Sequence, residues 1–535
     1  MSFDEIFDHI GGMGHYQIAL FAIIELQCMF NAFHAMAAIF LVPDQDHWCS
    51  VNTLTSLPYD VQKQVAIPQT DNGYENCDYY LLNYDNYTDA QYCDWESYRD
   101  NVTADTQECS AWNYDFTQFA RTAVTDYDLV CSRAPLVGVL YSSYVLALMI
   151  AAVTFGVISD YFGRKTVLMV CVVLQLVFAL VAAAAPNYGV FLAFRFLNAY
   201  CMIGSNLSSF IVITEVVGPD YRAVVGSIFW CIYGVGIVLL SIVSYFVTDY
   251  RYLQLVLALM MLPCLFYIWL VPESPRWLVD HQRVDKAVDI LQFIADVNHR
   301  DLPENVRDII QNDVQPSVKE SDHAKYTGES AEADHSEKPE QGEVEEADKV
   351  EKSENGKWHI LFVNRTMLKT LCILMPAWIA SSLVYWGISF NIGDLSGNLY
   401  VNVIISGAVE IPANVMPFIL VHYIGRKKTQ VFSLSAAGLF CLVSVPFVSE
   451  EGSDVVTYLA LTGKFFIVIA YTTIFFFTVE LFPTPVRNIA HGICNFVGNL
   501  AGLLAPFMGA PLMEIWLPLP LVIFGLVGIL AGTFE

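Results

Sequence analysis

Charged side chains are scarce in this chain of 535 residues, and positively charged ones are scarcest. Only 15% of the residues are Asp, Glu, Lys or Arg, whereas a soluble globular protein carries about 25%. The 27 Lys and Arg residues face 54 Asp and Glu residues, which gives a formal net charge of −27. The shortage of charge excludes an ordinary soluble enzyme. The shortage of positive charge excludes a nucleic-acid partner, whose phosphates attract basic surfaces.

Several motifs are also missing. The chain contains no GxxxxGK[ST] segment, which excludes a P-loop ATPase. It contains no cluster with metal-ligand spacing and no nucleophile–base pair at usable spacing, so we expect neither an enzyme nor a bound metal or cofactor. Residues 1–15 lack the basic stretch of a cleavable signal peptide, so we expect the first apolar run to be a membrane span.

Apolar residues dominate instead, at 55% of the chain, with a mean hydropathy of +0.46. A helix that crosses the hydrocarbon core of a bilayer needs about 20 mainly apolar residues. The sequence therefore predicts an all-α membrane protein with twelve transmembrane helices in two six-helix bundles. The predicted spans are 16–41, 136–159, 166–185, 189–212, 223–246 and 253–271, then 368–390, 399–421, 431–449, 455–479, 488–509 and 515–533.

Two hydrophilic insertions hold most of the net charge. Residues 43–135 contain 16 acidic and 4 basic residues, and residues 301–355 contain 17 acidic and 6 basic residues. Residues 283–312 have an amphipathic helical pattern, whereas 313–356 have almost no large apolar side chains and are expected to be disordered. The predicted domains are an amino-terminal bundle at 1–271, a cytoplasmic linker at 272–366 and a carboxy-terminal bundle at 367–535.

The short loops indicate the orientation in the membrane. Basic residues cluster in the loops after the second, fourth, eighth and tenth spans, all on one side of the bilayer. Short loops rich in Lys and Arg face the cytoplasm. We therefore expect both termini inside the cell and residues 43–135 outside it.

The insertion at 43–135 has the features of an extracellular loop. It carries glycosylation sequons at Asn86 and Asn101, and its cysteines are typical of an oxidising compartment. Five cysteines allow two disulfides and leave one over, and the sequence leaves both the pairing and an oligomer formed through this loop open. The disulfide candidates are Cys49, Cys77, Cys93, Cys109 and Cys131.

The two halves repeat two motifs. A loop with Gly-Arg-Lys follows the second span and the eighth, so that Gly163 and Gly425 are 262 residues apart. A Glu followed seven residues later by Arg comes after the fourth span and the tenth, with Glu215 and Glu480 265 residues apart. Two motifs at nearly one offset indicate duplicated bundles, an arrangement that binds substrate at the bilayer midplane between the halves.

The repeated charges suggest a gate. A basic residue in a short cytoplasmic loop can bond a carboxylate on a neighbouring helix, hold one conformation and release it in another. The alternative is that each Arg only anchors the topology at the lipid headgroups. The candidate gating residues are Asp160, Gly163, Arg164, Lys165, Glu215 and Arg222 in the first half and Gly425, Arg426, Glu480 and Arg487 in the second.

Several segments resemble known transporter motifs. The loop after the second span (GVISDYFGRK) resembles the signature of the major facilitator superfamily, and the segment at 272–278 (PESPRWL) narrows this to sugar porters and to the organic cation, carnitine and organic anion transporters. The opening FDEIFDHIGGMGHYQ and the segments SGNLY, VEIPA and ELFPTPVRN are similar to the organic ion branch. The resemblance covers nearly the whole chain and implies a plasma-membrane carrier that works by alternating access. The acidic insertion and the ending GTFE depart from the family pattern.

A charge inside the membrane costs roughly 2.5–3.5 kcal/mol, so each one is a functional candidate. The resemblance implies that Glu410, two residues before Pro412, is a pocket carboxylate of cation transporters; a structural hydrogen bond is the alternative. It places Asn499 where cation transporters carry Asp and anion transporters Arg. It also assigns aromatic residues to the pocket, whose ring faces attract ammonium groups, although each could equally be a packing residue: Phe229, Trp230, Trp378, Tyr385 and Tyr471.

Further polar groups lie in the predicted spans. Asn31 is a candidate substrate contact at membrane depth, whereas His34 is expected to hydrogen-bond a neighbouring group and not to bind substrate. Arg195 and Lys464 lie near the beginnings of spans four and ten, where extension of the side chain to the interface is the alternative to a functional role. Glu25 in the first span has no partner that the sequence identifies.

These patterns predict a gradient-driven transporter of small organic ions, most of all cations or zwitterions such as choline, carnitine or carcinine. The first alternative is an organic anion transporter of the same family. The second is a sugar porter, which usually has a shorter first loop. The third is a surface receptor whose helices only anchor it. Uptake of labelled substrate separates a transporter from a receptor, and competition by glucose identifies a sugar porter.

Overall fold

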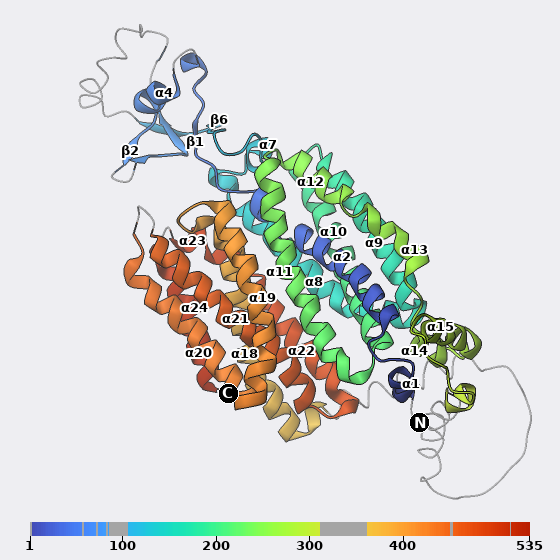
Figure 1. Cartoon of the computed structure of the whole chain (residues 1–535). Coiled ribbons are helices and arrows are strands. Elements are labelled where there is room, and N and C mark those ends of the chain that lie inside the picture. The colour runs from blue at the N-terminus through green and yellow to red at the C-terminus, as the bar shows by residue number, and fades with distance from the viewer. Residues whose placement is uncertain are drawn as a thin grey trace, which may run out of the picture.

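The computed structural model describes residues 3–55, 58–70, 73–81, 84, 105–310, 361–449, 453–513 and 515–534. Long helices run side by side, and a small region with strands lies at one end of them (Figure 1). Among these described residues, eleven helices are long and apolar enough to cross a membrane, and a further apolar helix is shorter. The predicted twelve-helix membrane architecture is confirmed.

The first half of the chain supplies six membrane spans. The sixth consists of two helices with a short 3-10 helix, Leu262–Phe266, between them. The bounds are α2 (His15–Met36, followed by α3, Ala38–Leu41), α8 (Pro135–Phe162), α9 (Arg164–Ala183), α10 (Tyr188–Val216), α11 (Arg222–Phe246), and α12 (Tyr250–Leu259) with α13 (Tyr267–Leu270).

The second half supplies the other six. Its last helix has 16 residues and is the short apolar one. The bounds are α18 (Arg365–Phe390), α19 (Leu399–Ile424), α20 (Arg426–Ser444), α21 (Asp454–Leu481), α22 (Thr484–Gly502) and α24 (Leu519–Phe534), with the short α23 (Ala510–Met513) before the last.

A glycine ends α8, and another ends α19. Gly163 and Gly425 have φ angles of 95° and 82°, a backbone conformation that residues with a side chain rarely adopt. The next helices, α9 and α20, begin at the following residues, Arg164 and Arg426. The Gly-Arg-Lys loops of the repeat are therefore tight turns that place basic residues in the first turn of the next helix.

The two halves meet along α11 and α19, which lie side by side (Figure 1). Two glycines permit this close approach, because a Cβ atom at Gly234 would lie only 3.0 Å from the carbonyl oxygen of Gly407. The halves also meet through aromatic side chains near the strand region, where Phe40 stacks on Tyr400 with ring centroids 5.5 Å apart. We call this end of the helices the loop end.

The opposite end, which we call the motif end, carries the Gly-Arg-Lys turns and the short helices α1 (Phe3–His9), α14 (Pro275–Asp280) and α15 (Val284–Val297). Asn298 joins these parts: its Nδ2 donates to the carbonyl of Ile10 at 3.0 Å and to Gln17 Oε1 at 2.9 Å. Helix α15 lies in the stretch predicted to be amphipathic. The acidic segment 313–356 lies outside the described residues.

Residues 43–135 add short strands that the all-α prediction did not include, because hydropathy finds membrane spans and is blind to two- or three-residue strands. The strands pair as three antiparallel ribbons. These are β1 (His47–Cys49) with β6 (Trp112–Tyr114), β2 (Gln69–Thr70) with β3 (Gly73–Tyr74), and β4 (Asp78–Tyr80) with β5 (Thr106–Glu108), accompanied by α4 (Tyr59–Ala66) and α7 (Ala123–Tyr127).

Two disulfides close this loop region. Cys49 is bonded to Cys109 and Cys77 to Cys131, each with Cα atoms 5.5 Å apart. The two links are interleaved along the chain, since each bond encloses one cysteine of the other. The remaining candidates in this loop lie outside the described residues: Cys93 and the sequon residues Asn86 and Asn101.

Asp126 of α7 fastens the loop region to α12. Its carboxylate accepts hydrogen bonds from the hydroxyl of Tyr250 at 2.6 Å and from Arg251 Nη2 at 2.9 Å, and it pairs with Arg121. Partial burial on its own raises the pKa of Asp126, but the hydrogen bonds from Tyr250, Arg121 and Arg251 hold that pKa below its ordinary value of 3.8.

Candidate functional site

A buried ion pair lies in the middle of the second half. Glu410 is about 17 Å along α19 and Lys464 about 15 Å along α21, at 1.5 Å per residue. Lys464 Nζ lies 2.8 Å from Glu410 Oε1, and the two side chains are only 1% and 3% exposed. Lys464 also donates to the hydroxyl of Ser406. The interface alternative for Lys464 is therefore wrong, because Glu410 holds its ammonium group at mid-membrane depth.

Aromatic side chains predicted for the pocket surround this ion pair. The hydroxyl of Tyr385 donates to Glu410 Oε1 at 3.3 Å, and Lys464 Nζ lies 5.6 Å from the centroid of the Tyr385 ring. Tyr471 stacks on Tyr385 with an interplanar angle of 6°, and Trp378 meets Tyr471 edge to face. Residues from α18, α19 and α21 thus form one polar and aromatic cluster.

The predicted aromatic pair on α11 divides between two environments. Phe229 is buried against Phe210, with ring centroids 5.4 Å apart. Trp230 is 42% exposed, and its carbonyl accepts a hydrogen bond from Asn414 Nδ2 at 3.4 Å. Asn414 is one turn from Glu410 on α19, so α11 reaches the ion-pair helix through its backbone, whereas the Phe229 ring packs into the first half.

Asn31 belongs to a separate polar network inside the first half. Its Oδ1 accepts from Gln175 Nε2 at 3.1 Å, and the carbonyl of Gln175 accepts from Asn198 Nδ2 at 2.9 Å. Ser209 donates to Gln27 Oε1 at 2.6 Å in the same region. The structure therefore connects Asn31 to α9 and α10 and does not bring it into the cluster around Glu410.

Arg195 is buried in this first-half network, so the interface alternative is wrong for this residue too. Its Nη2 donates to the carbonyl of His34 at 3.2 Å and its Nη1 lies 3.5 Å from Gln254 Oε1. Within the part of the chain that the structure describes, no carboxylate pairs with Arg195. His34 contributes only its backbone carbonyl to this contact, so the role predicted for its side chain stays a prediction.

Asn499 lies on α22, and its Nδ2 donates to Asn495 Oδ1 at 2.7 Å. The next residue towards the amino terminus, Gly498, abuts the backbone of Trp378, where an added Cβ would lie 3.0 Å from the Trp378 carbonyl oxygen. Asn499 is thus buried beside the helix that carries Trp378, with one amide oxygen left without a hydrogen bond among the described residues.

At the motif end, the arginines of the first motif copy form short ion pairs with nearby carboxylates. Arg164 Nη2 lies 2.8 Å from Asp160 Oδ1, and Arg164 Nε lies 3.4 Å from Glu215 Oε2. Arg222 Nη2 lies 2.7 Å from Asp4 Oδ1 of α1. Burial raises the pKa of Asp4, but Arg222 and Arg276 together hold it below its ordinary value of 3.8.

The segment PESPRWL packs over the first Gly-Arg-Lys turn. Glu273 Oε1 accepts from the backbone N–H of Lys165 at 3.0 Å, which satisfies a free donor in the first turn of α9. Trp277 Nε1 donates to the carbonyl of Asp160 at 2.7 Å. A Cβ at position 163 would collide with the Glu273 carboxylate, which would have to move away from the turn.

The second half arranges the same motif more openly. Arg426 Nη2 donates to Glu480 Oε1 at 2.9 Å, but the side chains of this ion pair are 51% and 47% exposed. An added Cβ at Gly425 would meet nothing within 4 Å. Arg487 Nε donates to the carbonyl of Phe482 at 3.3 Å. Among the described residues, the ion pairs of both motif copies stay within their own halves.

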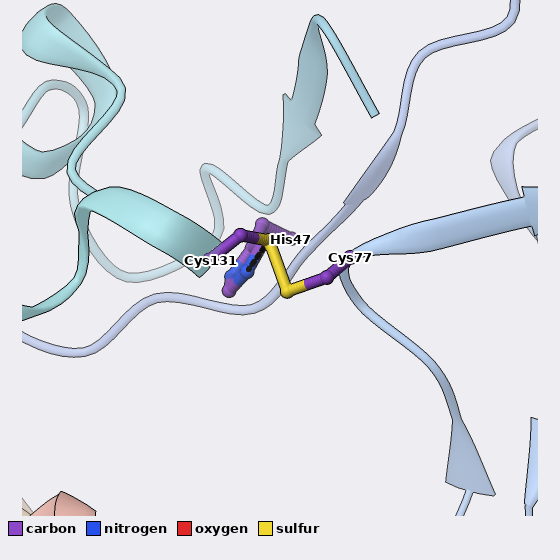
Figure 2. Close-up of side chains that lie close together, drawn as sticks. All are labelled: His47, Cys77 and Cys131. Carbon is purple, nitrogen blue, oxygen red and sulfur yellow. Dashed lines mark hydrogen bonds between the residues drawn. A yellow bond between two sulfur atoms is a disulfide. The ribbon is translucent and has the colours of Figure 1, made fainter. Parts of the chain in front are cut away.

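A group of metal-ligating residue types lies at the loop end. The ligand atoms of His47, Cys77 and Cys131 are within 4.8 Å of one another (Figure 2). The two cysteines, however, form a disulfide, so neither sulfur is a thiolate that could bind a metal ion. His47 Nε2 lies 4.0 Å from Cys131 Sγ. In this oxidised form the group is a covalent link packed against an imidazole, not a metal centre.

Two functional features escaped the sequence analysis. The first is the partnership of Lys464 with Glu410, for which the only signal was two opposite charges in the eighth and tenth spans. The second is the contact of Glu273 and Trp277 with the first turn, since PESPRWL served there only as a family mark. Both depend on helices that are distant in sequence, so a pattern along the chain cannot show them.

Comparison with known proteins gives a consistent result. The family described as "Sugar (and other) transporter" matches residues 81–534. The chain is 32% identical to the "Organic cation transporter-like protein" of Drosophila melanogaster, over 100% of this chain and 89% of that protein. It is 29% identical to solute carrier family 22 member 3 of Mus musculus, over 99% and 92%, and 28% identical to member 13 of Homo sapiens, over 99% and 89%.

Solved structures with the same fold are also found. The xylose transporter XylE from E. coli in its inward open conformation aligns with a TM-score of 0.59 at 16% identity, over 97% of this chain and 95% of that chain. Its partially occluded inward open conformation aligns with a TM-score of 0.58 at 14% identity, over 97% and 98%. At this identity the similarity concerns the fold alone.

Proposed function

This chain belongs to the organic cation, carnitine and organic anion transporter family of the major facilitator superfamily, and from that premise we propose that it carries small organic cations or zwitterions. As a member of this family it is a multi-pass membrane transporter of small organic ions and not an enzyme. The names of its relatives favour an organic ion over the sugar and receptor alternatives.

The observation that carries the proposal is the ion pair of Glu410 and Lys464 beside stacked tyrosines. A zwitterion can place its ammonium group on Glu410 and its carboxylate on Lys464, so that neither buried charge is left unpaired. A simple cation gains from the carboxylate and from the faces of Tyr385 and Tyr471, each worth about 0.5–2 kcal/mol.

A panel of labelled compounds tests the proposal. Cells that express the chain are compared with untransfected cells for uptake of tetraethylammonium, choline, carnitine, carcinine, urate and p-aminohippurate. We expect uptake of at least one cation or zwitterion, and we expect Glu410→Gln to reduce it selectively after correction for surface expression. Uptake of p-aminohippurate alone, or unimpaired cation uptake by Glu410→Gln, contradicts the assignment.

An organic anion is the second candidate, and one observation favours it. Arg195 is a buried cation without a carboxylate partner among the described residues, and its guanidinium could pair with a substrate carboxylate. Uptake of p-aminohippurate that Arg195→Gln abolishes, together with absent uptake of tetraethylammonium, choline and carnitine, decides for the anion.

We further propose that Arg164 and Arg487 hold the gate at the motif end closed through carboxylates of neighbouring helices. The carboxylates of Asp160 and Glu215 near Arg164 support this, because an ion pair at a helix end can change partners when the halves move. Wild-type uptake rates in both Arg164→Ala and Arg487→Ala contradict the gate and leave the anchor hypothesis.

The proposed location is the plasma membrane, with both termini in the cytoplasm and residues 43–135 outside. The placement of α1 and the end of α24 at the motif end, opposite the disulfides, supports this orientation (Figure 1). Peptide N-glycosidase should increase the mobility of the cell-surface protein, and the shift should vanish in Asn86→Gln/Asn101→Gln.

Oligomers joined through the outer loop are a further proposal, which non-reducing electrophoresis with and without crosslinker tests.

A further inference from the structure

Four charged side chains lie buried well inside the described membrane helices: Glu25, Arg195, Glu410 and Lys464. Glu410 and Lys464 neutralise each other at 2.8 Å. Arg195 reaches neutral acceptors. Glu25 differs from all three, because neither of its carboxylate oxygens has a hydrogen-bond partner in the described structure and the residue is only 6% exposed.

Glu25 lies about 15 Å along α2, near the middle of that helix, at 1.5 Å per residue. The residues three and four positions later on the same helix face contact α11: Cys28 Sγ donates to the Phe229 carbonyl at 3.3 Å, and a Cβ at Gly236 would lie 2.6 Å from the Met29 carbonyl oxygen. Glu25 therefore faces α11, the helix whose other side packs on α19 of the second half.

The groups around Glu25 cannot neutralise it. The titratable groups within its electrostatic range are the thiols of Cys28 on α2 and Cys231 on α11 and the phenol of Tyr267 on α13. Helices α10, α12 and α15 also pack on α2. Of the two charged residues of α10, Glu215 is already paired with Arg164. The other, Arg195, is bonded at His34, nine residues and about 13 Å farther along α2.

A bare carboxylate in such a place costs several kcal/mol, so in this conformation it binds a cation. Both carboxylate oxygens of Glu25 are fully buried, which leaves no room for an organic ammonium group beside them, but a proton needs none. We propose that Glu25 is a proton-binding site and that the substrate cation moves in exchange for that proton. The exchange part rests on the function proposed above, whereas the proton site does not.

Charge balance favours exchange over movement in the same direction. With Glu25 ionised, the four buried charges sum to zero. A proton on Glu25 or a bound monovalent cation raises the sum to +1, and both together raise it to +2 in a medium of low dielectric constant, which is unfavourable. One proton therefore leaves Glu25 on the side where the cation binds, and one proton returns on the side where the cation is released. No net charge crosses the membrane.

Infrared spectroscopy of the purified full-length protein tests the proton site without any substrate. A protonated carboxylic acid has a carbonyl stretching band that a carboxylate lacks. We expect such a band at neutral pH in the wild type, its loss in Glu25→Gln, and its retention in Glu480→Gln, the matched control, because Glu480 is paired with Arg426. A wild-type spectrum that Glu25→Gln leaves unchanged at neutral pH overturns the proposal.

Transport in proteoliposomes tests the exchange. With the membrane potential clamped at zero, an interior one pH unit more acidic than the outside should drive about tenfold accumulation of a labelled monovalent cation at equilibrium, since one unit is a factor of ten. Glu25→Gln should retain counterflow of the cation but not the accumulation. Wild-type counterflow without any response to the pH gradient overturns the exchange. Absent counterflow, with the infrared band present, contradicts the proposed substrate class and leaves the proton site standing.

Discussion

The two halves of the molecule bury their ion pairs at different places along the helices. At the motif end, the Arg164–Glu215 pair of the first half is 11% and 14% exposed, whereas the Arg426–Glu480 pair of the second half is 51% and 47% exposed. Glu273, on the segment that follows the sixth membrane span, packs on the first Gly-Arg-Lys turn, whereas a Cβ at Gly425 of the second turn would meet nothing within 4 Å.

Inside the membrane the comparison is reversed. The second half holds Glu410 and Lys464 as a closed ion pair, whereas the first half holds Glu25 and Arg195 without ion-pair partners among the described residues. The duplication has thus preserved the helices and the turns while the chemistry diverged. The proposed gate is therefore more closely packed in the first half, and the ion pair proposed to bind substrate lies in the second.

The largest expected effect comes from breaking the membrane ion pair. Glu410→Gln leaves the Lys464 ammonium buried without a carboxylate, which should destabilise the protein by about 3–5 kcal/mol and lower surface-corrected cation uptake at least tenfold. The double variant Glu410→Gln/Lys464→Met should recover much of the thermal stability but not the uptake. Equal thermal stability of the single and double variants would show that the pair is not closed in the membrane.

The next largest effect concerns the two motif copies. Arg164→Ala leaves the mostly buried Glu215 without its ion-pair partner and should reduce uptake several-fold at similar surface expression. Arg426→Ala removes an exposed pair, whose contribution is less than about 1 kcal/mol, and should leave uptake within twofold of wild type. Surface biotinylation with uptake checks both, and equal losses in the two variants contradict the asymmetry between the halves.

Substitutions at Gly163 and Gly425 give a further test of the difference between the two Gly-Arg-Lys turns. Gly163→Ala and Gly425→Ala both place a side chain at positive φ with an extended ψ, which only glycine readily adopts, at a cost of about 1–3 kcal/mol. Only Gly163→Ala adds a collision with Glu273, which we expect to cost about 1–3 kcal/mol more. Thermal unfolding should rank Gly163→Ala below Gly425→Ala. Adding Glu273→Ala should raise the unfolding temperature of Gly163→Ala but not that of Gly425→Ala. A rise in both variants would contradict the steric explanation.

The smallest effect is a pH dependence at the loop end. The pKa of Asp126 is below its ordinary value of 3.8 in the folded protein, so its contribution is fully present above about pH 4 and is lost as the pH falls through the lower folded value. Because Asp126 is partly exposed, we expect less than about 1 kcal/mol. Thermal unfolding of Asp126→Asn should therefore differ from wild type at neutral pH and converge with it in acid. A constant difference at all pH values contradicts this account.

Most of the fold could be predicted from the sequence. The runs of apolar residues are local, so spans such as 166–185 fall within two residues of helices such as α9 at Arg164–Ala183. The tight turns at Gly163 and Gly425 are also local, because each is formed by adjacent residues of a repeated Gly-Arg-Lys motif. The pairing of β1 with β6 and the pairing of the cysteines are not local, because each joins segments more than 50 residues apart.

The site could be predicted only in part. The family resemblance led to Glu410, Tyr385, Tyr471 and Trp378, and the structure gathers all four. Hydropathy could not tell that Lys464 belongs with them, because the depth of a charge depends on which carboxylate a neighbouring helix presents. Asn31 shows the opposite error, since a polar residue at membrane depth also fits a network that holds one half together.

The interleaved disulfides have a consequence for proteolysis in the loop region. A cut between Cys77 and Cys109 leaves two fragments joined by both bonds, whereas a cut between Cys49 and Cys77 leaves them joined by Cys49–Cys109 alone. A cut between Cys109 and Cys131 leaves Cys77–Cys131. No single nick between Cys49 and Cys131 releases the first membrane helix from the rest. A carrier nicked there therefore stays in one piece until a reductant breaks the remaining bond.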